Sequence, residues 1–177
     1  MRAYRIVEEE HDGQDGQSAA RPVEAAVRDG APPHDVFEHL HGALSRAVGF
    51  KVLTILKLDP VTLRSVRLYS SEPRYPIGGS KQHVRSGWSE AILGRRAAFV
   101  AHDLTALRAT FPDSAAIEAT GCGSIVAAPI IDRGLVVGTM NLWHREGYYD
   151  DAKALFLMPF ASAIAPIVRN ADQSTAG

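Results

Sequence analysis

The sequence has little cysteine, no long apolar run and no strong excess of charge of one sign, and each shortage excludes a class of protein. A single cysteine, Cys122, excludes an internal disulfide or a zinc site built from cysteines, and it fits a cytosolic protein. The longest uncharged run covers 15 residues and contains two prolines, whereas a membrane-spanning helix needs about 20 apolar residues. We therefore expect a cytoplasmic protein with no membrane partner.

The charge of the chain is balanced overall but unevenly distributed. A net charge of −1 over 177 residues lacks the strongly basic face of a nucleic-acid-binding protein, so we expect no nucleic-acid partner. The segment 1–21 is acidic and poor in large apolar side chains, which predicts a flexible N-terminal arm. The remaining length suits one globular domain at 22–171, followed by a disordered tail at 172–177.

The period of the apolar residues changes along the chain from helix to strand and back to helix. Branched residues separated by turn sequences predict two antiparallel hairpins, the second closed by a tight turn in which Gly134 takes a positive φ. Carboxylates at Asp150 or Asp151 predict the start of a long final helix, which Pro159 should kink. The expected elements are helices at 34–48, 87–93, 104–120 and 151–170, and strands at 50–58, 63–69, 98–101, 124–131 and 135–143.

This order of elements predicts an α+β fold. A central antiparallel sheet of five or six strands should carry the first and last helices on one face. The segment 70–86 has no period and is rich in proline and glycine, which is typical of a functional loop. Loops and short helices should therefore cover the other face of the sheet.

Two stretches of the sequence resemble the GAF domain family. They are the hairpin FKVLTILKLDPVTLRSVRLYSS at 50–71 and SIVAAPIIDRGLVVGTMNLWH at 124–144, and the resemblance extends over about 34–170. The segments YPIGG, FPD and GCGS most resemble those of short, free-standing bacterial GAF proteins. The resemblance implies a profilin-like fold with a small-ligand pocket between the sheet and its covering loops. It does not identify the ligand, because GAF domains hold cyclic nucleotides, tetrapyrroles, haem, amino acids, aromatic acids or nothing.

The resemblance also implies a homodimer built on the first and last main helices, from Val36 to Val48 and from Asp151 to Arg169. Independently of the family, these helices contain more apolar side chains than one sheet face is expected to cover, and an uncovered remainder favours association. The apolar residues concerned are Phe37, Leu40, Leu44, Leu155, Phe156, Phe160 and Ile164.

The candidate ligand site is the basic and aromatic segment 69–111, where residues 64–108 carry a net charge of +5. Apolar faces with a few fixed donors are typical of small-molecule sites, and Lys81 or Arg85 would pair with a carboxylate or phosphate. A solvated surface with aromatic side chains packed beneath it is the alternative. A buried Asn141 would either tie down a neighbouring loop or face the ligand. The expected ligand-binding residues are Tyr69, Tyr75, Lys81, Arg85, Trp88, Phe111, Ser124 and Asn141.

No catalytic or metal site is predicted. One branch of the GAF family reduces free methionine sulfoxide with cysteines, but Cys122 alone could form a disulfide only with another molecule, and a buried structural thiol is the simpler interpretation. The histidines lack carboxylates or cysteines at ligand spacing. We expect a sensory or regulatory domain that binds an anionic or aromatic metabolite, with no attached output domain and an unknown cofactor. A thiol-dependent reductase and a ligand-free dimerisation module remain alternatives.

Overall fold

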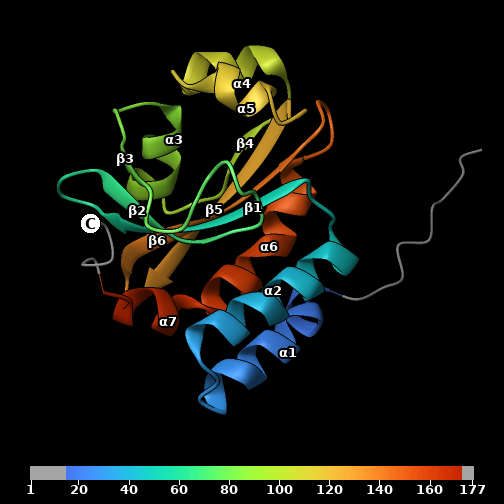
Figure 1. Cartoon of the computed structure of the whole chain (residues 1–177), viewed down its shortest axis with the longest axis vertical. Helices are drawn as coiled ribbons and strands as arrows, with labels where there is room; N and C mark the ends of the chain where they lie inside the picture. Colours follow the sequence, from blue (N-terminus) through green and yellow to red (C-terminus); the bar gives the residue numbers. More distant parts are fainter. Residues whose placement is uncertain (1–14, 173–177) are drawn as a thin grey trace, which may run out of the picture.

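The computed structural model describes residues 15–172, which form an α+β fold in three layers (Figure 1). The middle layer is a six-stranded antiparallel sheet with the spatial order β3-β2-β1-β6-β5-β4. Its strands are β1 (Val52–Asp59), β2 (Arg64–Ser70), β3 (Ser80–Gln82), β4 (Phe99–Ala101), β5 (Ser124–Asp132) and β6 (Leu135–His144). The predicted fold class and both predicted hairpins are confirmed.

Two groups of helices cover the two faces of the sheet (Figure 1). The larger helices on one face are α1 (Gly16–Arg28), α2 (Pro33–Ala47), α6 (Asp151–Ala163) and α7 (Ala165–Asn170). The opposite face carries the covering layer, which consists of α3 (Gly87–Ser89), the π-helix η1 (Glu90–Gly94), α4 (Leu104–Thr110) and α5 (Ser114–Glu118). None of the helices between residues 15 and 172 combines the length and the hydropathy that a membrane-spanning helix requires.

The turn between β5 and β6 has the predicted backbone geometry. Arg133 and Gly134 both have positive φ angles, of 48° and 79°, and Asp132 pairs with Leu135 across the turn. A two-residue turn of this kind matches the right-handed twist of the two strands. It therefore sets the register of the most buried hairpin.

The first helix corrects the expected start of the ordered domain. Helix α1 begins at Gly16, inside the segment predicted to be a flexible arm, and Asp15 caps it by accepting a hydrogen bond from the Ser18 backbone at 2.7 Å. A Cβ at Gly16 would lie 2.3 Å from the Phe156 carbonyl oxygen, so the small residue permits close approach to α6. Large apolar side chains are scarce in this segment, and small residues provide the packing instead. The remaining arm residues, 1–14, and the tail residues 173–177 lie outside the described part of the chain.

The apolar side chains of α2 and α6 are covered within one molecule. Phe37, Leu40 and Leu44 are at most 4% exposed, and Phe160 and Ile164 are fully buried. Because α1 packs against both helices, most of the apolar surface that motivated the homodimer is already used in the monomer core. Leu155, which is 73% exposed, and the half-buried Phe156 are the exceptions. The homodimer itself stays a prediction.

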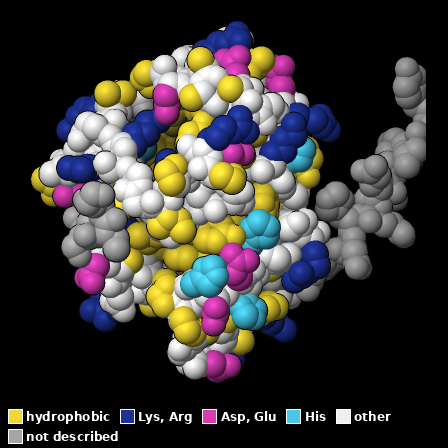
Figure 2. Space-filling model, viewed as in Figure 1, with side chains coloured by type: hydrophobic (Ala, Val, Ile, Leu, Met, Phe, Trp, Pro, Cys, Tyr) yellow, Lys and Arg dark blue, Asp and Glu magenta, His cyan; other side chains and the backbone are white. Residues whose placement is uncertain are grey.

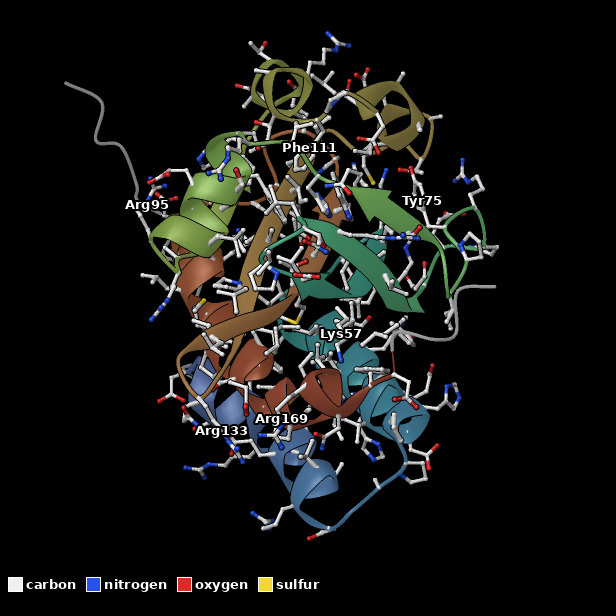
Figure 3. The ribbon with its side chains drawn as sticks, turned by 90° about the vertical axis from the view of Figure 1, so that its left-hand side faces the viewer. Lys57, Tyr75, Arg95, Phe111, Arg133 and Arg169 are labelled. Atoms are coloured by element: carbon white, nitrogen blue, oxygen red, sulfur yellow. The ribbon has the colours of Figure 1, made fainter. Side chains whose placement is uncertain are left out.

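The final helical segment, expected as one helix over 151–170, consists of two helices. Helix α6 begins after Asp150, which accepts a hydrogen bond from the Lys153 backbone at 2.8 Å, and it continues through Pro159. The break lies at Ile164, and Pro166 occupies the first turn of α7, where a helix leaves backbone donors unpaired and tolerates proline. Lys57 of β1 donates to the Arg169 carbonyl oxygen at 2.9 Å, which fastens α7 to the sheet (Figure 3).

Candidate ligand-binding site

A cavity of about 70 Å³, called the inner cavity below, lies between the sheet and the covering layer. Alternate side chains of each strand point to opposite faces of the sheet, which separates the cavity floor from the helix-side core. The floor comes from β1, β2, β5 and β6, and the roof from the covering layer and the loops around it. The lining residues are Val52, Thr54, Leu56, Arg67, Tyr75, Lys81, His83, Trp88, Phe111, Asp113, Ile117, Thr120, Ile125, Asn141 and Trp143.

The floor of the inner cavity carries a small polar network. Asn141 is only 4% exposed, and its Nδ2 donates to the hydroxyl oxygens of Thr54 at 3.3 Å and Thr139 at 3.2 Å. Thr54 and Asn141 are paired across β1 and β6, so the backbone register brings them together. Asn141 therefore both links two strands and lines the cavity.

Four aromatic side chains form the walls of the inner cavity. Phe111 and Trp143 pack edge to face with ring centroids 5.7 Å apart, while Trp88 comes from α3 and Tyr75 from the loop between β2 and β3. Figure 3 shows Phe111 beneath α4 and α5, with Tyr75 on the loop beside β2. Trp88 and Trp143 are also the only tryptophans of the chain. The cavity can therefore hold a flat apolar group between rings.

Arg67 of β2 supplies a cation to this cavity, and the YPIGG segment holds it in place. Its Nη1 donates to the Pro76 carbonyl oxygen at 2.9 Å, and its guanidinium lies 5.4 Å from the centre of the Tyr75 ring. A Cβ at Gly79 would lie 2.6 Å from Nη1, so a side chain there would displace the guanidinium from this position. The YPIGG segment therefore fixes the position of the Arg67 side chain.

The charge of Arg67 is not balanced by a protein carboxylate. It forms no ion pair within residues 15–172, and its buried Nε has no hydrogen-bond acceptor there. Burial lowers the pKa of Arg67, but the side chain remains charged at neutral pH because arginine ordinarily loses its proton only in strongly basic solution. An anion placed in the cavity would gain from this unpaired charge.

His83 adds a neutral ring to the wall. Its Nε2 shares a 2.7 Å hydrogen bond with the Ser65 hydroxyl, and its ring stacks on Trp88 with centroids 4.4 Å apart. Burial, reinforced by the nearby charge of Lys81, lowers the pKa of His83 to about 4. His83 therefore carries no charge in this cavity at neutral pH.

Lys81 and Asp113 form an ion pair at the cavity. Lys81 Nζ lies 2.6 and 2.7 Å from the two carboxylate oxygens of Asp113. With this pair neutralised and His83 uncharged, the net charge of the lining is that of Arg67. The lysine expected to bind an anionic ligand is thus already occupied by a protein carboxylate.

The structure brings five of the eight predicted site residues to the inner cavity: Tyr75, Lys81, Trp88, Phe111 and Asn141.

The other three lie elsewhere. Ser124 is fully buried and donates to the Arg145 carbonyl oxygen at 2.7 Å. Arg85 is exposed beside a separate shallow depression near the β1–β2 turn. Tyr69 faces α2, where its hydroxyl donates to Glu38 at 3.1 Å.

A bulge in β2 explains the position of Tyr69. Ile55 pairs with Tyr69 and Leu56 pairs with Arg67, so Leu68 is an extra residue in β2. Such a bulge shifts the alternation of side chains, which turns Tyr69 to the helix side although Arg67 faces the cavity. Strand periodicity alone places these two residues on the same face, and no signal in the sequence marks the bulge.

Sequence reasoning also missed several residues that line the cavity. Arg67 and Thr54 lie within predicted strands, where they resemble ordinary exposed positions of a half-buried sheet. Asp113 belongs to the FPD segment and His83 to the long loop, but their partners are distant in sequence. Only the alternation of the strands could have placed Thr54 and Trp143 on the cavity side.

Cys122 lies outside the cavity lining. Its side chain is 3% exposed in the apolar cluster beneath the covering layer, and burial raises its pKa. Thiolate formation is therefore disfavoured. Among residues 15–172, no group of three histidine, cysteine or acidic side chains could hold a metal ion.

The surface over the covering layer is rich in cations. On the face shown in Figure 2, lysine and arginine side chains are most frequent on the upper part, over the covering layer and β3. Histidines lie mostly lower, over α2. Acidic side chains lie among them, and four of the cations on this side are paired with carboxylates: Arg74 with Glu72, Lys81 with Asp113, Arg95 with Glu90 and Arg108 with Glu118.

Comparisons with solved structures give the same fold. The free methionine-R-sulfoxide reductase of Neisseria meningitidis, in complex with its substrate, has a TM-score of 0.66 at 15% identity, over 87% of this chain and 89% of that chain. The GAF domain of the Acinetobacter phosphoenolpyruvate-protein phosphotransferase has a TM-score of 0.64 at 14% identity, over 86% and 92%. The phycoerythrobilin-bound GAF domain of a cyanobacterial phytochrome has a TM-score of 0.63 at 17% identity, over 85% and 95%.

These identities are low, so the three likenesses establish architecture and not ligand or activity. A search of curated proteins found no match. The family model for the GAF domain matches residues 30–169. That range includes the whole sheet, the covering layer and nearly all residues of the cavity-bearing domain, and the chain therefore belongs to the GAF domain family.

Proposed function

We propose that this GAF domain is a sensor whose cavity binds a small anion with a flat apolar body. The observation that carries the proposal is the Arg67 guanidinium, which is charged, half-buried and unpaired among aromatic walls. A buried charge is costly unless it is paired, so Arg67 is best explained as one half of an ion pair whose other half is the ligand. The net charge of the lining fits a monoanion.

The size of the cavity restricts the ligand. Small-molecule sites commonly have volumes of about 300–1,000 Å³, whereas the inner cavity measures about 70 Å³. The neighbouring structure of a phytochrome domain holds phycoerythrobilin, but a tetrapyrrole is far larger than this cavity. We propose a smaller ligand, of the size of an aromatic carboxylic acid, whose ring lies between Phe111, Trp88 and Trp143.

Two alternatives to a sensor make different demands. One structural neighbour is a reductase, but a thiol-dependent reduction requires a reactive cysteine, and Cys122 is buried with a raised pKa. A ligand-free dimerisation module would have no need of an unpaired arginine in an aromatic cavity. The arginine therefore favours ligand binding over both alternatives.

The test is a thermal-shift screen with pairs of ligands that differ in charge and not in shape. Benzoate with benzamide, and phenylacetate with phenylacetamide, are suitable pairs, and a bound ligand raises the melting temperature by mass action. We expect the acids to stabilise the wild type more than the amides and to lose that advantage in Arg67→Met. Equal effects of acid and amide, or an acid effect that survives the substitution, would refute recognition through Arg67.

A further inference from the structure

The Lys81–Asp113 pair lies between the inner cavity and an open basin on the surface. The basin has a volume of about 460 Å³. The basin and the inner cavity have six lining residues in common, which form a shared wall between them. These residues are Arg67, Lys81, His83, Trp88, Phe111 and Asp113.

Lys81 and Asp113 close this wall from opposite sides. Lys81 belongs to β3, a three-residue strand at the edge of the sheet, and Asp113 immediately precedes the five-residue helix α5. Lys81 Nζ reaches both oxygens of Asp113 and lies 5.5 Å from the centre of the Phe111 ring. One ion pair therefore joins two short elements across the space between the inner cavity and the basin.

The Lys81–Asp113 ion pair is partly exposed, so little free energy is needed to separate its two side chains. The side chains of Lys81 and Asp113 are 32% and 47% exposed. Ion pairs between exposed side chains contribute little to stability and weaken as salt screens them. Both groups can instead be hydrated from the basin, so separating them buries no unpaired charge. The other residues of the wall are more firmly held, for example His83 by Ser65 and Trp88.

We propose that the Lys81–Asp113 ion pair is the gate of the site, and that its opening joins the basin to the inner cavity. The inference rests on the proposed function, because a gate regulates access for a ligand. With the gate open, a molecule larger than the inner cavity would extend from the aromatic walls into the basin. Access to the site would then depend on the charges of Lys81 and Asp113.

The two tryptophans allow the gate to be tested without any ligand. Trp143 lines the inner cavity but not the basin, whereas Trp88 lies on the wall that the two share. Acrylamide quenching of the Trp143 part of the intrinsic fluorescence, measured in a Trp88→Phe background, therefore reports how often a small neutral solute enters the inner cavity. Breaking the pair should raise the open fraction, so we expect Asp113→Asn and Lys81→Met each to increase the acrylamide quenching constant about twofold or more. Added sodium chloride should increase quenching in the wild type and have little effect in Asp113→Asn.

Iodide provides a second measurement that depends on charge. Asp113→Asn raises the net charge of the lining by one and Lys81→Met lowers it by one, although both open the gate. Iodide quenching should therefore rise more in Asp113→Asn than in Lys81→Met, while acrylamide quenching rises similarly in both. General loosening of the fold would not reproduce this difference in iodide quenching.

Two further variants control for loss of structure. Glu118→Gln breaks the Arg108–Glu118 pair, which also involves α5 but lines neither the inner cavity nor the basin, and it should leave quenching unchanged. The exchange Lys81→Asp with Asp113→Lys should restore the pair and return quenching toward the wild-type value. Unchanged acrylamide quenching in both single variants, or an equal increase in Glu118→Gln, would overturn the gate.

The gate and the proposed function can fail separately. If acrylamide quenching changes in the Lys81 and Asp113 variants but ligand binding does not depend on Arg67, the gate is retained and the proposal of an anionic ligand is rejected. If ligand binding depends on Arg67 but acrylamide quenching is unchanged in the Lys81 and Asp113 variants, the proposal of an anionic ligand is retained and the gate is rejected.

Discussion

Replacing Arg67 with methionine tests whether this arginine stabilises the fold or binds a ligand. Methionine preserves an unbranched apolar stem of similar width and removes the guanidinium. The stem should still pack at the cavity floor, between β1 and β3. The expected consequence is a large loss of anion binding with little change in the stability of the ligand-free protein.

The stability effect follows from opposing contributions. The variant loses the hydrogen bond to the Pro76 carbonyl oxygen and the contact with the Tyr75 ring, which together contribute about 1–2 kcal/mol. It also removes a buried Nε that has no acceptor in the described structure, which relieves a penalty of about 1–3 kcal/mol. The free energy of unfolding should therefore fall by no more than about 1 kcal/mol.

The binding effect has no compensating contribution. A hydrogen bond to a charged group contributes about 1.5–3 kcal/mol, so Arg67→Met should weaken an anionic ligand roughly ten- to more than a hundredfold. A neutral ligand of the same shape should lose far less. Arg67→Lys should retain part of the affinity, because lysine keeps the charge but cannot reproduce the planar geometry of the guanidinium.

Two measurements check the reasoning. Urea unfolding of the ligand-free proteins gives the stability change, and thermal shift or calorimetry with the aromatic acids gives the affinity change. Arg64→Met is the matched control, because Arg64 lies on the same strand with an exposed side chain and lines neither the inner cavity nor the basin. Destabilisation of Arg67→Met by more than about 2 kcal/mol would show that the arginine is structural, and refute the reasoning.

Three further predictions concern other parts of the molecule. His83 has a pKa of about 4 in the folded protein and a higher pKa in the unfolded chain. As the pH falls from about 6.5 to 4, the unfolded chain therefore takes up a proton before the folded protein does, which lowers the free energy of unfolding. Over that range the wild type should lose up to about 3 kcal/mol more stability than His83→Gln. Urea unfolding at several pH values measures this, and parallel curves would contradict it. Cys122→Ser should cost on the order of 1 kcal/mol and leave ligand binding intact; thiol-dependent reduction of free methionine sulfoxide by the wild type, lost in the variant, would restore the reductase interpretation. Light scattering should give about twice the chain mass of 19.1 kDa for a homodimer, whereas a monomer mass at tens of micromolar would remove that prediction.

The sequence alone was sufficient for five of the six strands and for both hairpins, whereas β3 lies in the segment 70–86 that was expected to be a loop. Strand periodicity and turn chemistry act over a few residues, so the runs around Thr54 and Asn141 and the turn at Gly134 could be recognised locally. It failed where packing depends on small residues. Gly16 lets α1 approach α6 closely, and that contact involves a residue 140 positions away.

The candidate site was only partly accessible to sequence reasoning. The clustering of aromatic and basic residues indicated the correct face of the sheet, because Tyr75, Trp88 and Phe111 lie on the segments that cover it. Which cation meets the ligand was not accessible. The choice depends on Asp113, which neutralises Lys81 across 32 residues, and on the bulge at Leu68.

Local sequence therefore determined most elements of this protein, apart from β3 and the start of α1, and the face that carries the cavity, because helix and strand periods are properties of neighbouring residues. The tertiary structure decided the chemistry of the cavity. Charge and hydrogen bonding depend on which groups meet after folding, and here folding left Arg67 without a partner while pairing Lys81 with Asp113. The two cations Arg67 and Lys81 thus have different roles because they meet different groups in the folded protein.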